Sequence, residues 1–432
     1  MTRFHIPLCM AIFGLWFLSA EALPATNSSL DTGIVKASQL EPPTELTLAA
    51  ALHYALESNP DLAAARNEVA AVAATIRQAG TRPNPEVSAL VEDTRSSTRT
   101  NTLQLAQPIE LGGKRAARIE AASLGRDAAE ADLQIKRAEI RAAVITAYFD
   151  VVVAQERVRL AEASTALAQR ATKASTNRVI AGKASPVEET KSKVAEANVR
   201  VEHLQAASEL ASARKRLTST WGNTSPRFLR TDASSDKLPT AAPHSDLAAR
   251  LANAPATVRA RLEIDRRKAL VQVEKSRRTP NLTLTLGAKR DQQVGRTQTV
   301  LGLSMPLPLF DRNQGNLLEA LRRANKAEDE LASAQIRVDG DLAQAEERLR
   351  AALQELDLIQ KEILPGATSA YDAASIGFDA GKFGFLDVLD AQRTLLQAKS
   401  QYLRVLSDAH RAAADIDRVL GEPFDVPSVV TH

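Results

Sequence analysis

A proline-free stretch of the chain, running from Lys114 to about Ile180, limits the possible folds more than any other feature. As a single α-helix, at 1.5 Å per residue, it would be roughly 100 Å long. Its apolar residues recur every seven positions, on rows that include Val144, Val151 and Val158. Such a sustained period predicts long helices that pack side by side with left-handed supercoiling.

The composition agrees with an elongated helical protein. Aromatic residues make up only 4% of the 432 residues, whereas charged residues make up 25%. This balance favours long helices and coiled coils over one large compact core. The net charge is +3, and no block of Lys and Arg with interleaved aromatics occurs, which argues against a nucleic-acid-binding protein.

The sequence also contains an internal duplication. Ala-Gly-Lys occurs at 181–183 and again at 380–382, an offset of 199 residues (380 minus 181). Proline-containing markers repeat in the same order, namely Asn59-Pro60 with Ala254-Pro255, Arg82-Pro83-Asn84 with Thr279-Pro280-Asn281, and Gln107-Pro108 with Met305-Pro306. We therefore predict a first structural repeat over 23–220, an irregular linker or equatorial segment over 221–245, and a second repeat with a C-terminal tail over 246–432.

Each repeat contains two short segments in which apolar and polar residues alternate, the signature of a strand pair. The apolar members are Val87, Ala89 and Val91, then Leu103 and Leu105, in the first repeat, and Leu282, Leu284 and Leu286, then Leu301 and Leu303, in the second. Each segment is near the 9–11 residues that cross a bilayer as a tilted strand, but four strands cannot close a barrel. Two copies would give eight strands and three would give twelve, whereas the alternative is a soluble four-stranded sheet.

The N-terminus has the pattern of a secretory signal peptide over 1–22, with cleavage expected after Ala22. Its apolar run, from Ile6 to Ser19, is too short to span a bilayer as a helix. The only cysteine, Cys9, lies in this run without the small-residue box of a lipidated cysteine, so we expect the mature chain to have no thiol. No later stretch is apolar enough for a transmembrane helix, so membrane insertion would require strands.

The two copies of Ala-Gly-Lys lie between helical segments and therefore predict the tips of two helical hairpins. We expect these tips to be the working end of the molecule and to dock a partner through Gly182 and Lys183 in the first tip and Gly381, Lys382, Phe383 and Phe385 in the second. Phe378, Phe383 and Phe385 cluster in a chain poor in aromatics. They could contact a partner or pack the tip internally, and the sequence leaves both readings open.

Asp387 and Asp390 follow the second tip and, being three residues apart, share one helix face. Three copies around an axis would place six carboxylates in a narrow mouth, which favours cations. The alternative is two solvated carboxylates at a helix start, where the helix dipole favours negative charge. Glu188 and Glu189 are weaker equivalents in the first tip.

The sequence gives no sign of a catalytic or cofactor site. The histidines after position 22 are isolated from one another and lack neighbouring Cys or regularly spaced carboxylates, so no metal site is expected. No nucleophile elbow, phosphate-binding loop or dinucleotide fingerprint occurs in a convincing context. Gly112-Gly113-Lys114 reads as a turn between strand and helix. We therefore predict a protein that is not an enzyme and has no cofactor.

Several segments in the correct order resemble the TolC-like outer membrane factors, and within them the heavy-metal branch of cobalt-zinc-cadmium efflux. They are LTLAAALHYALESNP, QPIELGGKRAARIEAA, LPLFDRNQGN and, most specifically, AGKFGFLDVLDAQRTL. The resemblance implies a mainly α fold with a small β part, in which long coiled-coil-like hairpins form an α-barrel. It also implies a homotrimer whose four strands per chain form a 12-stranded transmembrane β-barrel in the outer membrane of a Gram-negative cell.

The resemblance further implies that the helical tunnel projects into the periplasm and docks with a periplasmic adaptor protein and a proton-driven inner-membrane pump of the resistance-nodulation-division (RND) class. Residues matching Asp387 and Asp390 form acidic rings across the tunnel in this family. The position of a basic gate residue is taken by Phe383 here, so a charged latch is not expected. The predicted function is passive export of divalent heavy-metal cations. A duct for organic toxicants and a periplasmic coiled-coil adaptor are the alternatives.

Overall fold

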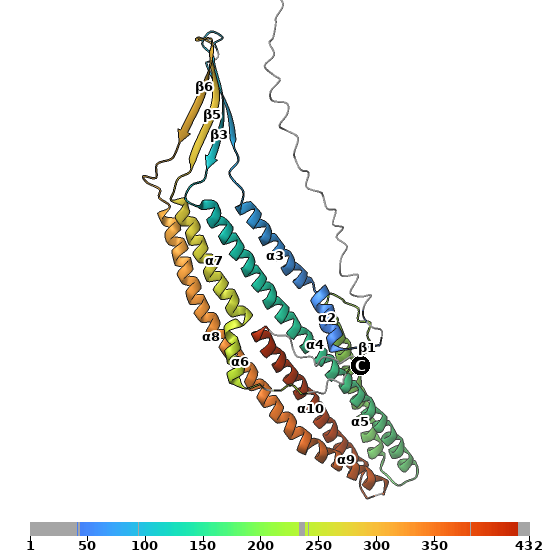
Figure 1. Ribbon diagram of the computed structural model, residues 1–432. Helices are drawn as coiled ribbons and strands as arrows, with labels where there is room; N and C mark the ends of the chain where they lie inside the picture. The colour runs from blue at the N-terminus through green and yellow to red at the C-terminus, as the bar shows by residue number, and fades with distance from the viewer. Residues whose placement is uncertain are drawn as a thin grey trace, which may run out of the picture.

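The computed structural model describes residues 41, 44–93, 95–232, 238–240, 242–380 and 382–421. The predicted signal peptide, Cys9 and Gly381 lie outside these residues. The molecule is elongated, with a sheet at one end, long helices along its body and two helical hairpin tips at the other end (Figure 1). Within the described part, no helix is long and apolar enough to cross a membrane.

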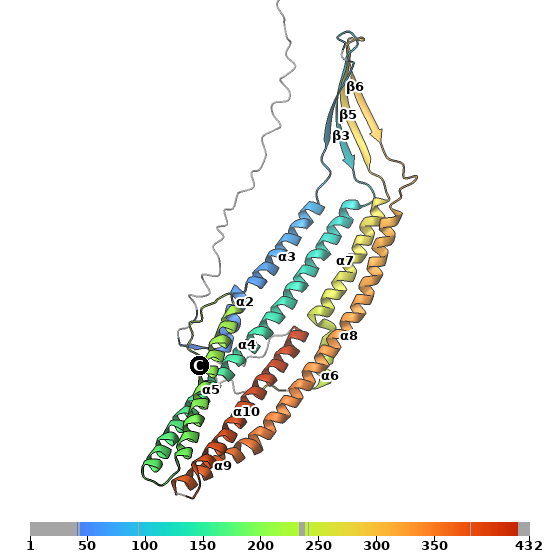
Figure 2. The ribbon, with the colours of Figure 1, turned by 180° about the vertical axis from the view of Figure 1, so that it is seen from behind.

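The upper half of the body is a wall one helix thick. Four helices lie side by side in the order α3, α4, α7 and α8, as both ribbon views and the helix contacts agree (Figures 1 and 2). Their bounds are Pro60–Ala79 for α3, Lys114–Ile180 for α4, Pro255–Arg277 for α7 and Gln314–Leu358 for α8. The helix predicted from Lys114 to Ile180 is therefore confirmed as one continuous element.

The lower half consists of two hairpins packed against each other. Helix α4 turns into α5 (Pro186–Ser219), and α8 continues through η2 (Ile359–Ile363) and α9 (Leu364–Asp379) before the chain turns into α10 (Phe385–Leu420). Helix α10 packs between α4 and α8. The helix changes to η2, a π-helical turn, just before Pro365, because proline has no N–H with which to continue the helical bonding.

Two end-to-end junctions connect the upper and lower helices. Gly222, just after α5, lies against Pro60 at the start of α3, and Gly421, just after α10, lies against Pro255 at the start of α7. Both glycines have left-handed backbones, with φ of 78° and 76°, where a side chain would be strained. The two halves of the chain thus contain corresponding helices joined in the same way. The predicted boundaries of the two repeats stay predictions.

The strands form one antiparallel sheet in the order β2-β3-β5-β6, with bounds Glu86–Glu92, Thr100–Ile109, Leu282–Asp291 and Arg296–Ser304. The register aligns Val87 with Leu105, Leu105 with Leu286, and Leu286 with Leu301. One face of the sheet is therefore a continuous apolar surface, and Leu301 on it is 76% exposed. Within the described chain, β2 and β6 each have one unpaired edge.

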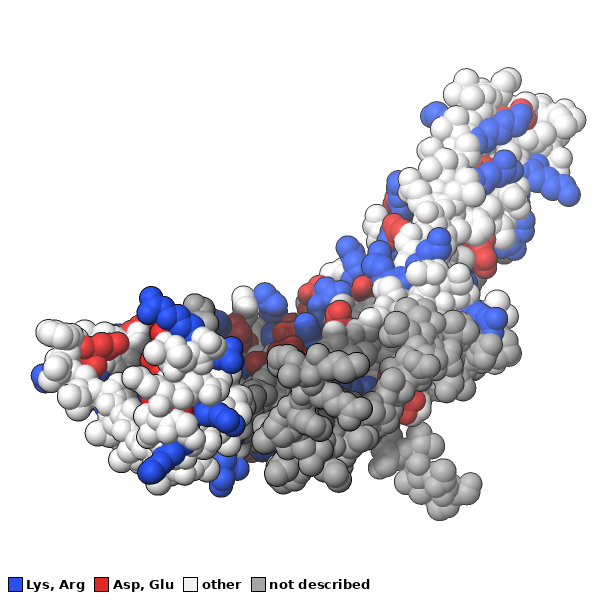
Figure 3. Space-filling view, turned by 90° about the horizontal axis from the view of Figure 1, so that it is seen from above, with Lys and Arg blue, Asp and Glu red and all other residues white. Residues whose placement is uncertain are grey.

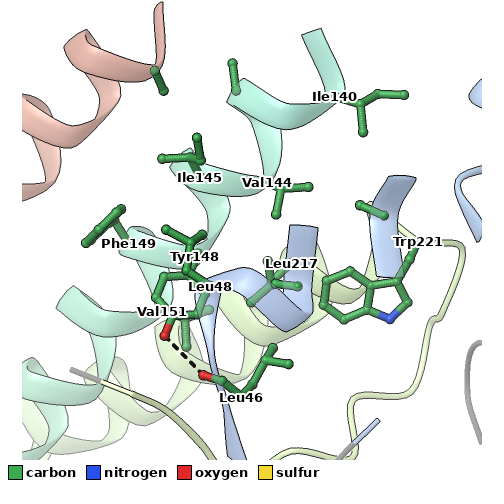
Figure 4. Close-up of a cluster of buried hydrophobic side chains, with 14 of the residues drawn as sticks. Leu46, Leu48, Ile140, Val144, Ile145, Tyr148, Phe149, Val151, Leu217 and Trp221 are labelled. Atoms are coloured by element: carbon green, nitrogen blue, oxygen red, sulfur yellow. Dashed lines mark hydrogen bonds between the residues drawn. The ribbon is translucent and has the colours of Figure 1, made fainter. Parts of the chain in front are cut away.

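A compact module packs on one face of α4 near mid-length. It contains β1 (Glu45–Leu46), α2 (Leu48–Ser58) and β4 (Arg230–Thr231), and β1 pairs with β4 in parallel. The Tyr148 hydroxyl donates to the carbonyl oxygen of Leu46 at 3.1 Å (Figure 4). It also lies 2.8 Å from the carbonyl oxygen of Asp232, to which it donates as well.

The predicted linker over 221–245 is less irregular than its composition indicates. Trp221 is fully buried in the largest apolar cluster, and its indole N–H donates to the buried Glu41 carboxylate at 2.7 Å. The short helices α6 (His244–Arg250) and η1 (Leu251–Asn253) then lead into the second half. Part of this segment therefore belongs to a folded module, because a buried aromatic side chain anchors it.

Candidate functional site at the hairpin tips

The two tips close with the same backbone hydrogen bond. The N–H of Lys183 donates to the carbonyl of Arg178 at 2.8 Å, and the N–H of Lys382 donates to the carbonyl of Gly377 at 2.7 Å. The two donor residues are 199 positions apart in the sequence, and so are the two acceptor residues. A hydrogen bond that closes six residues in this way is a common end to a helix. In the first tip Gly182 supplies the left-handed residue, with φ of 70°. The structure thus makes the two tips equivalent turns.

The acidic side chains of the first tip are held in ion pairs. Glu188 pairs with Arg178 at 3.0 Å, across the hairpin from α5 to α4. Glu189 pairs with Lys193 at 2.6 Å and accepts a hydrogen bond from Thr176 at 3.0 Å. The hydrogen bonds from Lys193 and Thr176 lower the pKa of the Glu189 carboxyl. These two carboxylates are neutralised locally.

The second tip lacks those partners. At the 199-residue offset, Glu188 corresponds to Asp387, but Arg178 corresponds to Gly377, which has no side chain. The Asp387 carboxylate accepts a hydrogen bond from the N–H of Gly384 at 2.8 Å, and the N–H of Asp387 donates to the carbonyl of Gly384 at 3.1 Å, at the start of α10. Asp390 is exposed, and within the described chain neither aspartate forms an ion pair. The second tip therefore presents carboxylate charge that the first tip cancels.

The aromatic side chain of the second tip occupies the space that Gly377 leaves. The ring of Phe383 lies directly over Gly377, so a Cβ at position 377 would collide with it. Phe383 nevertheless remains 50% exposed. It both packs the tip and offers an apolar surface, so the two readings of this residue are not exclusive. The side chains of Phe378 and Phe385 lie outside the described atoms.

The remaining predicted docking residues lie at the extreme end of the molecule. Lys183 and Lys382 are both exposed on the turns that close the two tips. The pairing of Arg178 with Glu188 was not anticipated from the sequence, although the 199-residue offset contains the signal. Within the described chain, no group of three or more His, Cys, Asp or Glu side chains could hold a metal ion.

A wall of long hairpins one helix thick, open at both edges and continued by a four-stranded sheet, defines a class of elongated channel-forming proteins rather than a globular one. The matches to known proteins agree. The family described as "Outer membrane efflux protein" matches residues 51–223 and 247–422. The chain belongs to this family of outer membrane channels, which extend into the periplasm.

Individual relatives fit the same picture. The chain is 47% identical over 421 residues to the cobalt-zinc-cadmium resistance protein CzcC of Cupriavidus metallidurans CH34, covering 98% of this chain and 100% of the relative. A membrane protein from Pseudomonas aeruginosa superposes with a TM-score of 0.74 at 20% identity, covering 89% of this chain and 92% of that one. VceC from Vibrio cholerae gives 0.71 at 20% identity, covering 87% and 96%. These structures support the TolC-like fold.

Proposed function

We propose that this protein is the outer membrane duct of a tripartite efflux system and passively conducts divalent heavy-metal cations out of the cell. The observation that carries the metal class is the 47% identity to a cobalt-zinc-cadmium resistance protein over that relative's entire length. An adaptor protein in the periplasm and a proton-driven pump of the RND class in the inner membrane would complete the system. Energy then comes from the pump, and the duct itself needs neither a catalytic site nor a cofactor.

The open edges of the chain support assembly into a ring of three copies. Joining the free edge of β6 to the free edge of β2 in the next copy would give a closed twelve-stranded sheet with its apolar face toward lipid. The same head-to-tail contact would pair the edge helices of the wall, and a heterologous contact of this kind closes into a ring. Unpaired strand edges and an exposed apolar face are otherwise costly in water.

The edge helix α5 has the surface that such a contact needs. It packs mainly on α4, and its apolar residues Val187, Val194 and Val201 recur every seven positions with exposures of 60%, 57% and 53%. On the opposite edge, α8 exposes Ile336 and Leu358. A seven-residue apolar stripe without a partner is typical of a helix that packs on another helix.

The hairpin tips then form the periplasmic mouth of the tunnel and its docking surface for the adaptor. Asp387 and Asp390 from three copies would give six carboxylates, which attract divalent cations and repel anions. Their lack of ion pairs distinguishes them from Glu188 and Glu189. With Phe383 at the tip, closure would rest on apolar packing rather than on a charged latch.

Two alternatives differ in what they predict. A duct for organic toxicants needs the same architecture, so only the transported substrate separates it from the metal duct. A periplasmic adaptor is less consistent with four strands and two hairpins in one chain. The family match does not favour it.

A deletion strain tests the substrate class. We expect it to become sensitive to zinc, cobalt, cadmium or nickel, and to keep its resistance to dyes and antibiotics. Sensitivity to organic compounds alone would overturn the metal assignment. Membrane fractionation with native mass analysis tests the architecture, because a soluble monomer would contradict the duct.

The contact between copies can be tested separately. Charges placed on the α5 stripe, in Val194→Glu with Val201→Glu, should lower the trimeric fraction, because burying carboxylates and losing apolar contact would oppose packing. The matched control is Val294→Glu, an exposed valine in the β5–β6 turn at the far end of the molecule. Equal trimer content in both variants would exclude α5 from the contact.

A further inference from the structure

A groove of about 470 Å³ lies between α4, α5 and α10, well away from the tips. Four arginines line it, Arg157 from α4, Arg216 from α5, and Arg404 and Arg411 from α10. Basic and acidic side chains are interleaved along the surface seen from above, without one broad basic patch (Figure 3).

Two of these arginines use the carboxylates of the groove. Arg157 pairs with Glu209 at 2.5 Å. Arg411 reaches Asp150 at 3.2 Å and Asp408 at 3.6 Å. Each of the three acidic residues that line the groove thus pairs with Arg157 or Arg411.

Arg216 and Arg404 are the two remaining arginines of the groove. Their guanidinium groups form no ion pair or hydrogen bond with any residue that the structure describes, and both side chains are exposed. The buried Ser407 lies between Arg404 and Arg411 in sequence and lines the same groove, where its hydroxyl adds a possible donor. Four arginines against three carboxylates leave the groove with one net positive charge per copy.

The groove opens on the face of α4 opposite to the compact module. Val144, Tyr148 and Val151 face α2 and β1, whereas Asp150, Val153 and Arg157 line the groove. At about 100° per residue, these two sets point roughly half a turn apart around the helix. One face of the wall is therefore covered by the module, and the other is open.

This step rests on the proposed function. In a ring of three copies, the module must lie outside the tunnel, because three copies of it inside would obstruct the passage. The arginine-lined groove of each copy then faces the interior. Three such grooves would form a positively charged level in the middle of a tunnel whose mouth is acidic.

We propose that this groove is an oxyanion-binding site in which Arg216 and Arg404 hold a phosphate-like or multiply carboxylated anion. Guanidinium groups match such anions because their planar N–H groups bind two oxygens at once. Oxyanions held in the three grooves would offset the positive charge of the arginines and so lower the electrostatic barrier to the passing cations.

The test is binding of inorganic phosphate, and separately of citrate, to the purified detergent-solubilised trimer, measured by calorimetry at low ionic strength. The double variant Arg216→Gln with Arg404→Gln should weaken binding at least ten-fold. Arg322→Gln with Arg337→Gln removes the same charge from two exposed α8 arginines that form no ion pair within the described chain. This control should bind like the wild type. Tighter binding of phosphate than of citrate would identify a phosphate-like ligand, and the reverse order would identify a multiply carboxylated one.

Lysine variants keep the positive charge and so distinguish a specific loss of anion binding from a folding defect. Arg216→Lys with Arg404→Lys should bind more weakly than the wild type but more tightly than the glutamine variant, because lysine cannot bind two oxygens in the same way. No binding of either anion to the wild-type trimer would overturn the proposal, and so would an equal loss in the α8 control. The deletion strain's metal sensitivity tests the duct independently, so failure of one does not entail failure of the other.

Discussion

The ring of Phe383 lies over Gly377, and this contact distinguishes the second hairpin tip from the first. The corresponding positions of the first tip hold Ala184 and Arg178. The second tip thus combines the large Phe383 with Gly377, which has no side chain, whereas the first tip combines the small Ala184 with the long Arg178. The exchange replaces an ion pair by apolar packing and leaves Asp387 without an arginine partner.

We expect Gly377→Ala to loosen the second tip. The added Cβ would collide with the Phe383 ring, and overpacking of this kind costs about 1–3 kcal/mol. Hydrogen exchange of the turn between α9 and α10 should therefore become faster, while the rest of the protein stays protected. Unchanged exchange in this turn would mean that the ring does not rest on Gly377.

Two further variants separate the clash from a general effect of alanine. Gly340 lies inside α8 with no atom near its would-be Cβ, so Gly340→Ala should stabilise the protein by about 0.5–1 kcal/mol. Adding Phe383→Ala to Gly377→Ala should remove the collision, and the two effects should therefore not be additive.

Neutralising the aspartates of the second tip should change ion selectivity. Asp387→Asn keeps an oxygen that can accept from the Gly384 N–H, so the capping interaction survives while the charge is lost. Together with Asp390→Asn, it removes six charges from the proposed trimeric mouth, and the cation-to-anion permeability ratio in planar bilayers should fall several-fold.

The paired glutamates of the first tip provide the comparison. Glu188→Gln with Glu189→Gln removes the same number of charges, but these carboxylates are already compensated by Arg178 and Lys193. We expect a smaller change in selectivity. If both double variants behave like the wild type, the tip carboxylates do not line the mouth.

The hydroxyl group of Tyr148 should matter for the stability of the module on α4. Tyr148→Phe would leave the carbonyls of Leu46 and Asp232 without this donor, and such a loss costs about 1–3 kcal/mol when the groups are buried. Chemical unfolding should therefore occur at a lower denaturant concentration. Tyr371→Phe is the control, since the described residues give that hydroxyl no hydrogen bond, and it should have little effect.

Stability should decrease in mildly acidic solution because of His410. Its ring is 2% exposed and stacks on Phe149 with centroids 3.7 Å apart, at the seam between α10 and α4. Burial lowers the pKa of His410 from its ordinary 6.5 to about 4. Between about pH 4 and pH 6.5, the unfolded chain therefore binds a proton at this histidine that the folded chain does not bind. The free energy of unfolding consequently falls as the pH decreases across this range.

The size of this effect is about 1.4 kcal/mol for each pH unit within the window. His410→Phe keeps an aromatic ring against Phe149 and removes the titrating group, so unfolding measured from pH 7 to pH 4 should depend less on pH. An equal dependence in wild type and His410→Phe would contradict the prediction.

Most of the architecture could be predicted from local patterns. The seven-residue period from Lys114 to Ile180 predicted α4, alternation at Leu282, Leu284 and Leu286 predicted β5, and the recurrence of Ala-Gly-Lys predicted two equivalent turns. The first two signals lie within one segment and reflect the geometry of a helix or a strand, and the third compares two copies of one short turn. The polar composition of 221–245 did not predict that Trp221 and Phe228 are buried in the apolar cluster on α4.

The sequence by itself determined the long helices, the strand pairs, the duplication and the acidic pair Asp387 and Asp390. Only the tertiary structure decided which side chains have partners. It paired Glu188 with Arg178, set Phe383 on Gly377, and left Arg216 and Arg404 together in one groove. The physical reason is that periodicity reports the local backbone, whereas ion pairs, packing and grooves depend on side chains from separate helices that the fold brings together.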